Sequence, residues 1–536
     1  MANTGFLVLT NPARVTKLLP VIKKHVLKTL YIQYFPERNI FISDTNLLSS
    51  SSLKWKGPRY AQTVANIYEF ASTISSRLDV RVLLSCLKNP NVSIIHTKRP
   101  VELVIFDQEH NKKDADLFIQ DYLSNTSMGC NFIIIDENHQ DTSSSASLSG
   151  NNDHNPEMEN GVEKFYKNVI LGGTFDRLHN GHKILLSEAI LYCSENLTVG
   201  VTDENMLKSK ILWELIESCE QRVNVLKDFL VDVDPGLNYN VVPISDIYGP
   251  TKDDPNLNLL VVSEETVRGG AKVNELRLDR GLPKLDVHVV KLMPDKQHNE
   301  NEEPKISSSN QRIRLLGTRI RQPNLNGKTL RPYIIGLTGG IASGKSSIAE
   351  KLEKLGAGHV NCDKIAHDLY EPGKECYNLV VKNFGPSILN TKQLIDRKTL
   401  GNIVFNNKEQ LNKLNNLVWP AILKEAKSQI NNLHEKGVDV IVLEAAVLIQ
   451  ANWQNYCHEI WTCIIPEQEA VKRVMERNSL SEEEAKQRIT VQPSNVQQIN
   501  AANVVVSTLW SHEVTQKQVQ KAWNELMIYL KEIPDR

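Results

Sequence analysis

The sequence lacks the features of a membrane-spanning or strongly charged protein. No apolar run reaches the roughly 18–20 residues that a membrane span needs. The net charge is −1, from 62 basic and 63 acidic residues, so no global field would recruit nucleic acid. We therefore expect neither a transmembrane segment nor a nucleic-acid partner, and any phosphate recognition must come from local sites.

Cysteine is present, but its spacing does not fit a metal site or a disulfide framework. No two cysteines form a CxxC pair, and none stands at zinc-ligand spacing from a histidine. The pattern favours reduced thiols in an intracellular protein. The eight cysteines are Cys86, Cys130, Cys193, Cys219, Cys362, Cys376, Cys457 and Cys463.

The length of 536 residues suggests roughly three domains of ordinary size. Residues 136–163 are rich in Ser, Asn and Asp and poor in apolar residues, which predicts a disordered linker. A shorter break at 321–327 precedes the last third of the chain. We therefore predict units at 1–135, 164–320 and 332–536.

Short apolar runs, several of them β-branched, recur in the middle and last units with helix-capable sequence between them. This pattern predicts two consecutive α/β domains, each with a parallel sheet and crossover helices, after an N-terminal region that also looks α/β. The runs of the middle unit are 168–171, 197–201, 239–244, 257–262 and 286–292. Those of the last unit are 333–337, 438–443, 459–465 and 503–506, and those of the first are 6–9, 80–84, 101–106 and 131–135.

The segment 339–346 fits the pattern G-x-x-x-x-G-K-S and follows an apolar run that reads as a strand. Glycines let backbone N–H groups cradle phosphate oxygens, and Lys345 can reach the β and γ phosphates. The Ser346 hydroxyl can ligate Mg²⁺. We predict that ATP binds to Gly339, Gly340, Ile341, Ala342, Ser343, Gly344, Lys345, Ser346 and Ser347.

Other residues of the unit 332–536 indicate which phosphoryl transfer this loop serves. An arginine-bearing helical segment follows, with Arg473, Arg477 and Arg488, as a phosphoryl-transfer lid would need. Residues 334–510 resemble dephospho-CoA kinase. The resemblance implies transfer of the ATP γ-phosphate to the ribose 3′-hydroxyl of dephospho-CoA, with Asp363 as general base. The segment 443–450 departs from the bacterial pattern, which weakens any role for Glu444 in this reading.

The middle unit carries the sequence His179-Asn180-Gly181-His182 after an apolar run and the turn at 172–176. Two imidazoles at a helix start can both face a phosphate, and Gly181 permits close backbone approach. Residues 168–316 resemble the HxGH nucleotidyltransferases, and among them phosphopantetheine adenylyltransferase of the animal type.

That resemblance implies in-line attack by 4′-phosphopantetheine on the α-phosphorus of ATP, with release of pyrophosphate. His182, His179 and Lys208, together with Mg²⁺, would stabilise the developing negative charge. It also places ATP against Gly172, Thr174, Phe175, His182, Ser307, Ser308 and Ser309.

The product of the first reaction is the substrate of the second, so the whole chain resembles the bifunctional coenzyme A synthases of animals. One alternative keeps the chemistry and changes the substrates: a cytidylyl- or nicotinate-type transferase fused to a nucleoside kinase. Another is an interaction scaffold with residual enzymatic domains. Both intact motifs argue against a scaffold as the sole role.

The first unit has no phosphate loop and no catalytic cluster. Its early basic residues, Arg14, Lys17, Lys23, Lys24 and Lys28, would suit a mitochondrial presequence or a membrane-surface anchor. We favour a first strand at 5–9 leading into a basic-faced helix. We expect partner or membrane docking through 1–135, catalysis that survives its deletion, and a cytoplasmic protein, with mitochondrial association as the open alternative.

Overall fold

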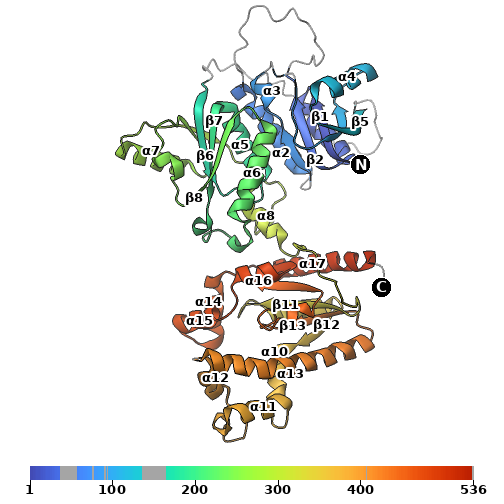
Figure 1. Ribbon diagram of the computed structural model, residues 1–536, viewed down its shortest axis with the longest axis vertical. Helices are drawn as coiled ribbons and strands as arrows, with labels where there is room; N and C mark the ends of the chain where they lie inside the picture. Colours follow the sequence, from blue (N-terminus) through green and yellow to red (C-terminus); the bar gives the residue numbers. More distant parts are fainter. Residues whose placement is uncertain are drawn as a thin grey trace, which may run out of the picture. The chain divides into compact units, whose positions relative to one another are not determined.

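The computed structural model describes residues 1–36, 57–74, 78–89, 92, 94–135, 164–405 and 407–533. The chain divides into two compact units, Met1–Asn310 and Gln311–Arg536 (Figure 1). Three five-stranded parallel sheets are present in the described part of the chain, two in the first unit and one in the second. The predicted α/β class is thereby confirmed. The predicted linker at 136–163 lies outside the described residues.

The first sheet has the order β3-β2-β1-β4-β5. Its central strand β1 is the predicted opening strand, whereas β2 was not predicted, because its mixture of polar and apolar residues reads as a continuing basic helix. The strands are β1 (Ala2–Leu9), β2 (Val26–Tyr34), β3 (Asp79–Val82), β4 (Val101–Phe106) and β5 (Thr126–Ile134). The helices are α1 (Val15–Ile22), α2 (Ala61–Ile74), α3 (Ser85–Lys88) and α4 (Lys112–Tyr122).

The second sheet has the order β10-β9-β6-β7-β8, and each of its five strands falls on a predicted apolar run. Counted along the chain, both sheets place the first strand centrally, the next two on one side and the last two on the other. The strands are β6 (Tyr166–Gly173), β7 (Cys193–Thr202), β8 (Asn238–Ile244), β9 (Leu259–Ser263) and β10 (Asp286–Val290). The helices are α5 (Asn180–Tyr192), α6 (Cys219–Val233), α7 (Val267–Asp279) and α8 (Ser308–Leu315).

Parallel sheets of this order bind ligands at the carboxyl ends of the strands where the winding reverses. In the first sheet this point lies between β1 and β4, and the carboxylate of Asp107 occupies it. Asp107 accepts hydrogen bonds from the Thr10 amide (2.7 Å), the Thr10 hydroxyl (3.0 Å) and the Asn11 amide (3.1 Å), and it is fully buried. The amides of Thr10 and Asn11 at this point are therefore already bonded to a carboxylate of the protein itself.

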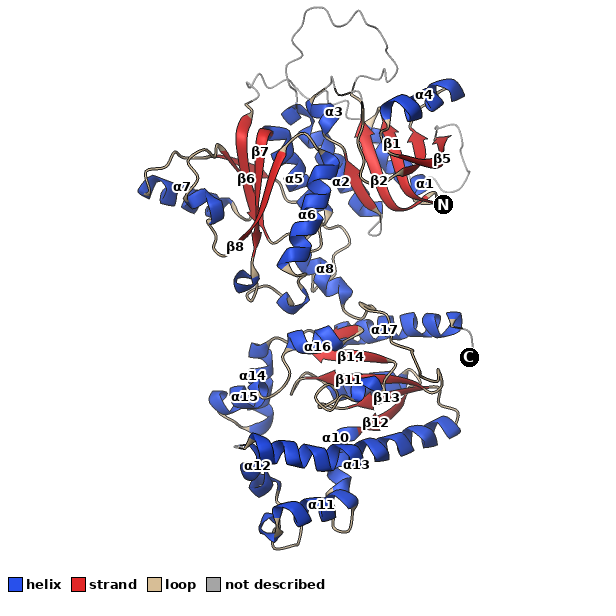
Figure 2. Cartoon of the chain, in the orientation of Figure 1, coloured by secondary structure: helices blue, strands red, loops and turns tan. Residues whose placement is uncertain are grey.

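The third sheet, in the second unit, has the order β12-β13-β11-β14-β15. Helices cover both faces: α10 and α13 pack on one, and α9 and α17 pack on the other (Figure 2). The strands are β11 (Tyr333–Gly339), β12 (Gly358–Asn361), β13 (Val440–Glu444), β14 (Glu459–Ile464) and β15 (Val504–Ser507). The helices are α9 (Lys345–Lys354), α10 (Cys362–Leu369), α11 (Glu375–Phe384), α12 (Arg397–Phe405), α13 (Lys408–Glu435), α14 (Glu467–Asn478), α15 (Glu482–Thr490), α16 (Asn495–Ala501) and α17 (His512–Glu532).

No helix among the described residues combines the length and the apolar character that crossing a bilayer requires.

Candidate active sites

The first site is built at the start of α5, after the central strand β6. His179 is the N-cap of this helix, and its Nδ1 accepts a hydrogen bond from the His182 amide at 3.4 Å. The two imidazole rings stack with their centroids 3.7 Å apart. A Cβ at Gly181 would lie 3.2 Å from the His179 ring, so a larger residue there would press on this ring. The structure therefore brings His179 and His182 together at a helix N-terminus, where an anion is favoured.

The surroundings of His182 keep its imidazole neutral. Its ring packs against Phe175, with centroids 5.2 Å apart. Desolvation, assisted by the positive charge of Lys210, lowers the pKa of His182 to about 3. At neutral pH this side chain can therefore give a hydrogen bond to a phosphate oxygen but carries no charge of its own.

The charge that acts on His182 comes from Lys210, two residues beyond the predicted Lys208. Lys208 and Lys210 are both exposed, and the charge of Lys210 also contributes to the lowered pKa of Lys305, after the desolvation of that group. Lys210 is thus a second candidate for the cation of this site beside the predicted Lys208. The sequence contains both lysines in one Lys-Ser-Lys segment, and its spacing cannot say which of them faces the histidine.

The serine-rich turn comes from a distant part of the sequence and lies beside the two histidines. The Ser308 hydroxyl donates to the Asp176 carbonyl at 2.9 Å and lies 3.5 Å from His179 Nε2. Ser307 Oγ accepts from the Asn310 amide at 3.1 Å and so caps the first turn of α8, which holds Ser309. This second helix start adds further N–H groups to the same site.

Arg222 was not predicted as part of this site, yet it fixes the ends of β6 and β7. Its buried guanidinium donates to the carbonyls of Thr174 (2.6 Å) and Thr202 (2.8 Å), and the two threonine hydroxyls lie 3.1 Å apart. The predicted ATP-binding residues Gly172 and Thr174 lie at this strand end. The Phe175 side chain is buried, and its ring packs against that of His182.

The second site is the loop between β11 and α9. A Cβ at Gly339 would lie 2.5 Å from the Cys463 carbonyl, and one at Gly344 would lie 2.8 Å from Thr508, at a φ of +89°. The loop therefore needs both glycines to pack this closely. Lys345 Nζ folds back onto the Gly339 carbonyl at 2.9 Å, and desolvation lowers its pKa.

Glu444, which sequence reasoning left without a role, lies next to the predicted metal ligand. It ends β13, is 1% exposed, and accepts hydrogen bonds from Ser346 Oγ (2.8 Å), His359 Nε2 (2.9 Å) and Asn361 Nδ2 (3.0 Å). Burial alone would raise the pKa of Glu444, but the hydrogen bonds from His359 and Ser346 outweigh it and keep the carboxylate ionised.

A hydroxyl beside an ionised carboxylate is the kind of oxygen pair that Mg²⁺ prefers. In the described ranges, no group of three or more His, Cys, Asp or Glu side chains could hold a metal. Mg²⁺ commonly needs one or two protein oxygens and takes its other ligands from phosphates and water. The donor set of Ser346 and Glu444 therefore fits the predicted Mg²⁺ better than a closed metal cage.

Asp363 lies in the first turn of α10, where the charges of Lys345 and Glu444 both act on it. Desolvation by the surrounding protein raises the pKa of Asp363, Lys345 opposes this shift, and Glu444 adds to it. The side chain stays exposed, so a substrate hydroxyl can approach it. A carboxylate with a raised pKa is better matched to accepting a proton.

The three predicted lid arginines differ in their surroundings. Arg473 donates to both the hydroxyl and the carbonyl of Thr508 (2.8 Å each), and Thr508 in turn bonds the Ser343 carbonyl, so Arg473 braces the loop. Arg477 is exposed in the last turn of α14, and its charge acts on Lys345. Arg488 is exposed on α15.

Comparison with known proteins matches both sites to families. A family model described as dephospho-CoA kinase matches residues 333–510, and one described as cytidylyltransferase-like matches residues 170–314. The two matches contain the two sites described above, one each. The chain is therefore a bifunctional enzyme, with a nucleotidyltransferase-like domain followed by a kinase domain.

Individual relatives match the second unit. A dephospho-CoA kinase of Carboxydothermus hydrogenoformans is 42% identical over 186 residues, which cover 35% of this chain and 90% of that protein. A dephospho-CoA kinase of Syntrophus aciditrophicus is 37% identical over 194 residues, covering 36% of this chain and 83% of that protein. The solved structure of dephospho-CoA kinase from Campylobacter jejuni is 28% identical, with a TM-score of 0.29, and covers 36% of this chain and 96% of that one.

Proposed function

This chain belongs to the dephospho-CoA kinase family through its second unit, and we propose that it performs the last two steps of coenzyme A biosynthesis in order. The nucleotidyltransferase-like domain would transfer the adenylyl group of ATP to 4′-phosphopantetheine. The kinase domain would then phosphorylate the dephospho-CoA formed. The observation that carries this proposal is the presence of both sites in one chain. An HxGH site that makes a nucleotide-containing product precedes a kinase site of the family that consumes dephospho-CoA.

In the adenylyl transfer, an oxygen of the 4′-phosphopantetheine phosphate attacks the α-phosphorus of ATP. One P–O bond forms, the bond to the bridging oxygen breaks, and pyrophosphate leaves. No proton has to move, so the site contributes position and electrostatics. Neutral His182 would donate a hydrogen bond to the phosphate, the two helix starts would add N–H groups, and Lys210 would supply the positive charge.

In the phosphoryl transfer, the ribose 3′-hydroxyl oxygen would attack the γ-phosphorus, the bond to the β–γ bridging oxygen would break so that ADP leaves, and the hydroxyl proton would pass to Asp363. The loop amides would hold the phosphates, while Lys345 leaves the Gly339 carbonyl to contact the transferring group. Ser346 and Glu444 would hold Mg²⁺, which neutralises phosphate charge when bound. The distance of 2.8 Å between Ser346 Oγ and Glu444 Oε1 supports this proposal, because two oxygens this close could bind one ion.

The decisive assay supplies purified protein with 4′-phosphopantetheine, ATP and Mg²⁺ and follows products by chromatography. We expect CoA, with dephospho-CoA as a transient. Supplying dephospho-CoA alone tests the kinase separately. Absence of both products would refute the proposal, and turnover of CTP or of nicotinate mononucleotide in preference would establish the alternative substrates.

Glu444→Gln is expected to raise the Mg²⁺ concentration needed by the kinase reaction by about tenfold or more, because the amide removes one anionic ligand at the metal position. The measurement is the rate of dephospho-CoA phosphorylation against Mg²⁺ concentration. The exposed Glu435→Gln at the end of α13 is the matched control. An unchanged Mg²⁺ dependence in Glu444→Gln would remove Glu444 from the metal site.

A further inference from the structure

The two sheets of the first unit share one hydrophobic core. A single continuous cluster of buried side chains includes Leu7 and Ile32 from the first sheet and Val169 and Val199 from the second. A backbone hydrogen bond also joins the two halves of this unit, since the Leu84 amide donates to the Val233 carbonyl at 2.8 Å. The described residues of 1–135 therefore share a core with the nucleotidyltransferase-like domain, and the expectation that catalysis survives their deletion stays a prediction.

The contact centres on α5, the helix that begins with the two active-site histidines. Helix α2 packs along α5. Asn180 Nδ2 donates to Ser72 Oγ at 2.7 Å and to the Tyr68 carbonyl at 3.2 Å. Lys183 Nζ, on a side chain only 4% exposed, donates to Asp79 Oδ1 at 2.6 Å and to the Val80 carbonyl at 2.8 Å.

Helical spacing gives the first turn of α5 two separate faces. Residues three apart lie on one face, so His179 and His182 share one face and Asn180 and Lys183 share the next. The first pair forms the candidate active site. The side-chain hydrogen bonds of the second pair go to residues of β3 and α2.

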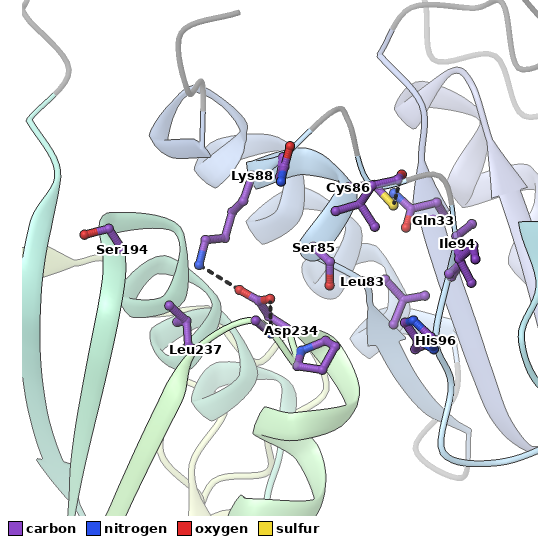
Figure 3. Close-up of a pocket in the computed structure, with 15 residues that line it drawn as sticks. Gln33, Leu83, Ser85, Cys86, Lys88, Ile94, His96, Ser194, Asp234 and Leu237 are labelled. Carbon is purple, nitrogen blue, oxygen red and sulfur yellow. Dashed lines mark hydrogen bonds and ion pairs between the residues drawn. The ribbon is translucent and has the colours of Figure 1, made fainter. Parts of the chain in front are cut away.

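A network of ion pairs connects Asp79, the partner of Lys183, to helix α6. Asp79 also pairs with Arg81 (2.9 Å), and Arg81 reaches Asp232 (2.6 Å) and Asp228 (3.0 Å) on α6. Arg81 and Asp232 are both buried, so their ion pair replaces part of the hydration that each charge loses. Figure 3 shows a further link at the rim of the same contact, where Lys88 pairs with Asp234 at 2.7 Å.

We propose that residues 1–135 act as a positioning domain for adenylyl transfer, holding the first turn of α5 through Ser72 and Asp79 so that His182 faces the reacting phosphate. Asn180 and Lys183 are then positioning residues, since they touch the supporting domain. The inference rests on the proposed adenylyl transfer. It adds a role for residues 1–135, whose described part carries no phosphate loop.

The test uses the full-length protein and measures both half-reactions separately. Asp79→Asn is expected to lower kcat for dephospho-CoA formation roughly tenfold, because small displacements of a catalytic group are costly. KM for ATP should change little, and phosphorylation of supplied dephospho-CoA should be unchanged. The exposed Asp121→Asn on α4 is the matched control.

A double-mutant cycle separates positioning from simple loss of stability. Ser72→Ala and Asn180→Ala each remove one side of the same hydrogen bond, so the double variant should lose no more kcat than Asn180→Ala alone. Asp79→Glu should recover part of the loss in Asp79→Asn.

Additive effects in the cycle, or a normal kcat in both Asp79→Asn and Ser72→Ala, would overturn the positioning role. If Asp79→Asn is insoluble, the cycle alone decides the outcome. A wild-type protein that forms no dephospho-CoA would instead refute the proposed function, so the two failures are distinct.

Discussion

Lys345→Ala is expected to convert the protein into an enzyme that stops at dephospho-CoA. Lys345 is the cation of the β11–α9 loop, where it folds back onto the Gly339 carbonyl. Its removal should lower kinase turnover by about a hundredfold or more, equivalent to about 2.7 kcal/mol of transition-state stabilisation. With 4′-phosphopantetheine and ATP supplied, dephospho-CoA should accumulate at the wild-type rate.

Lys354→Ala, which removes an exposed lysine from the last turn of the same helix, is the control and should leave CoA output unchanged. A Lys345→Ala protein that still produces CoA at the full rate would show that the loop lysine does not act on the transferring phosphate. Loss of both half-reactions together would indicate misfolding, which thermal denaturation would detect.

His182→Ala is expected to stop the pathway one step earlier. Adenylyl transfer should fall by about a hundredfold or more, while phosphorylation of supplied dephospho-CoA should stay normal. Because the pKa of His182 is lowered to about 3, the ring should act through a hydrogen bond and not through charge. His182→Gln, which keeps a neutral N–H donor, should therefore retain more activity than His182→Ala.

The exposed His25→Ala is the matched control in the same unit. Equal activities of His182→Gln and His182→Ala would contradict the hydrogen-bond role. The same pH profile of adenylyl transfer is expected between pH 6 and 8 for the wild type and for His182→Gln, because His182 should stay neutral over this range. A step there in the wild type that disappears in His182→Gln would mean that the ring is charged when it works.

Features dictated by neighbouring residues could be predicted from the sequence. The loop at 339–346 and the pair His179 and His182 are such features, because glycine conformation and helix starts act over a few residues. The strand order follows the ordinary rules for parallel sheets with crossover helices. Strands β2 and β12 were missed because one is mixed in polarity and the other has only four residues.

Features that depend on packing between distant segments could not be predicted. Glu444 meets Ser346 only because β13 lies beside β11 in the observed register. Whether Lys208 or Lys210 acts on the phosphate depends on how the chain turns after β7. The anchoring of Asn180 and Lys183 depends on a whole second sheet, and no local pattern in 179–183 reports it.

Asp107 is buried at the point where the strand order of the first sheet reverses, and this bears on how many nucleotides one polypeptide binds. The Asp107 carboxylate takes the amide hydrogen bonds of Thr10 and Asn11 at this strand end, so a phosphate would have to compete with it for these donors. Within the described part of the chain, saturation with a non-hydrolysable ATP analogue should therefore stop at two molecules per polypeptide, although three wound sheets are present.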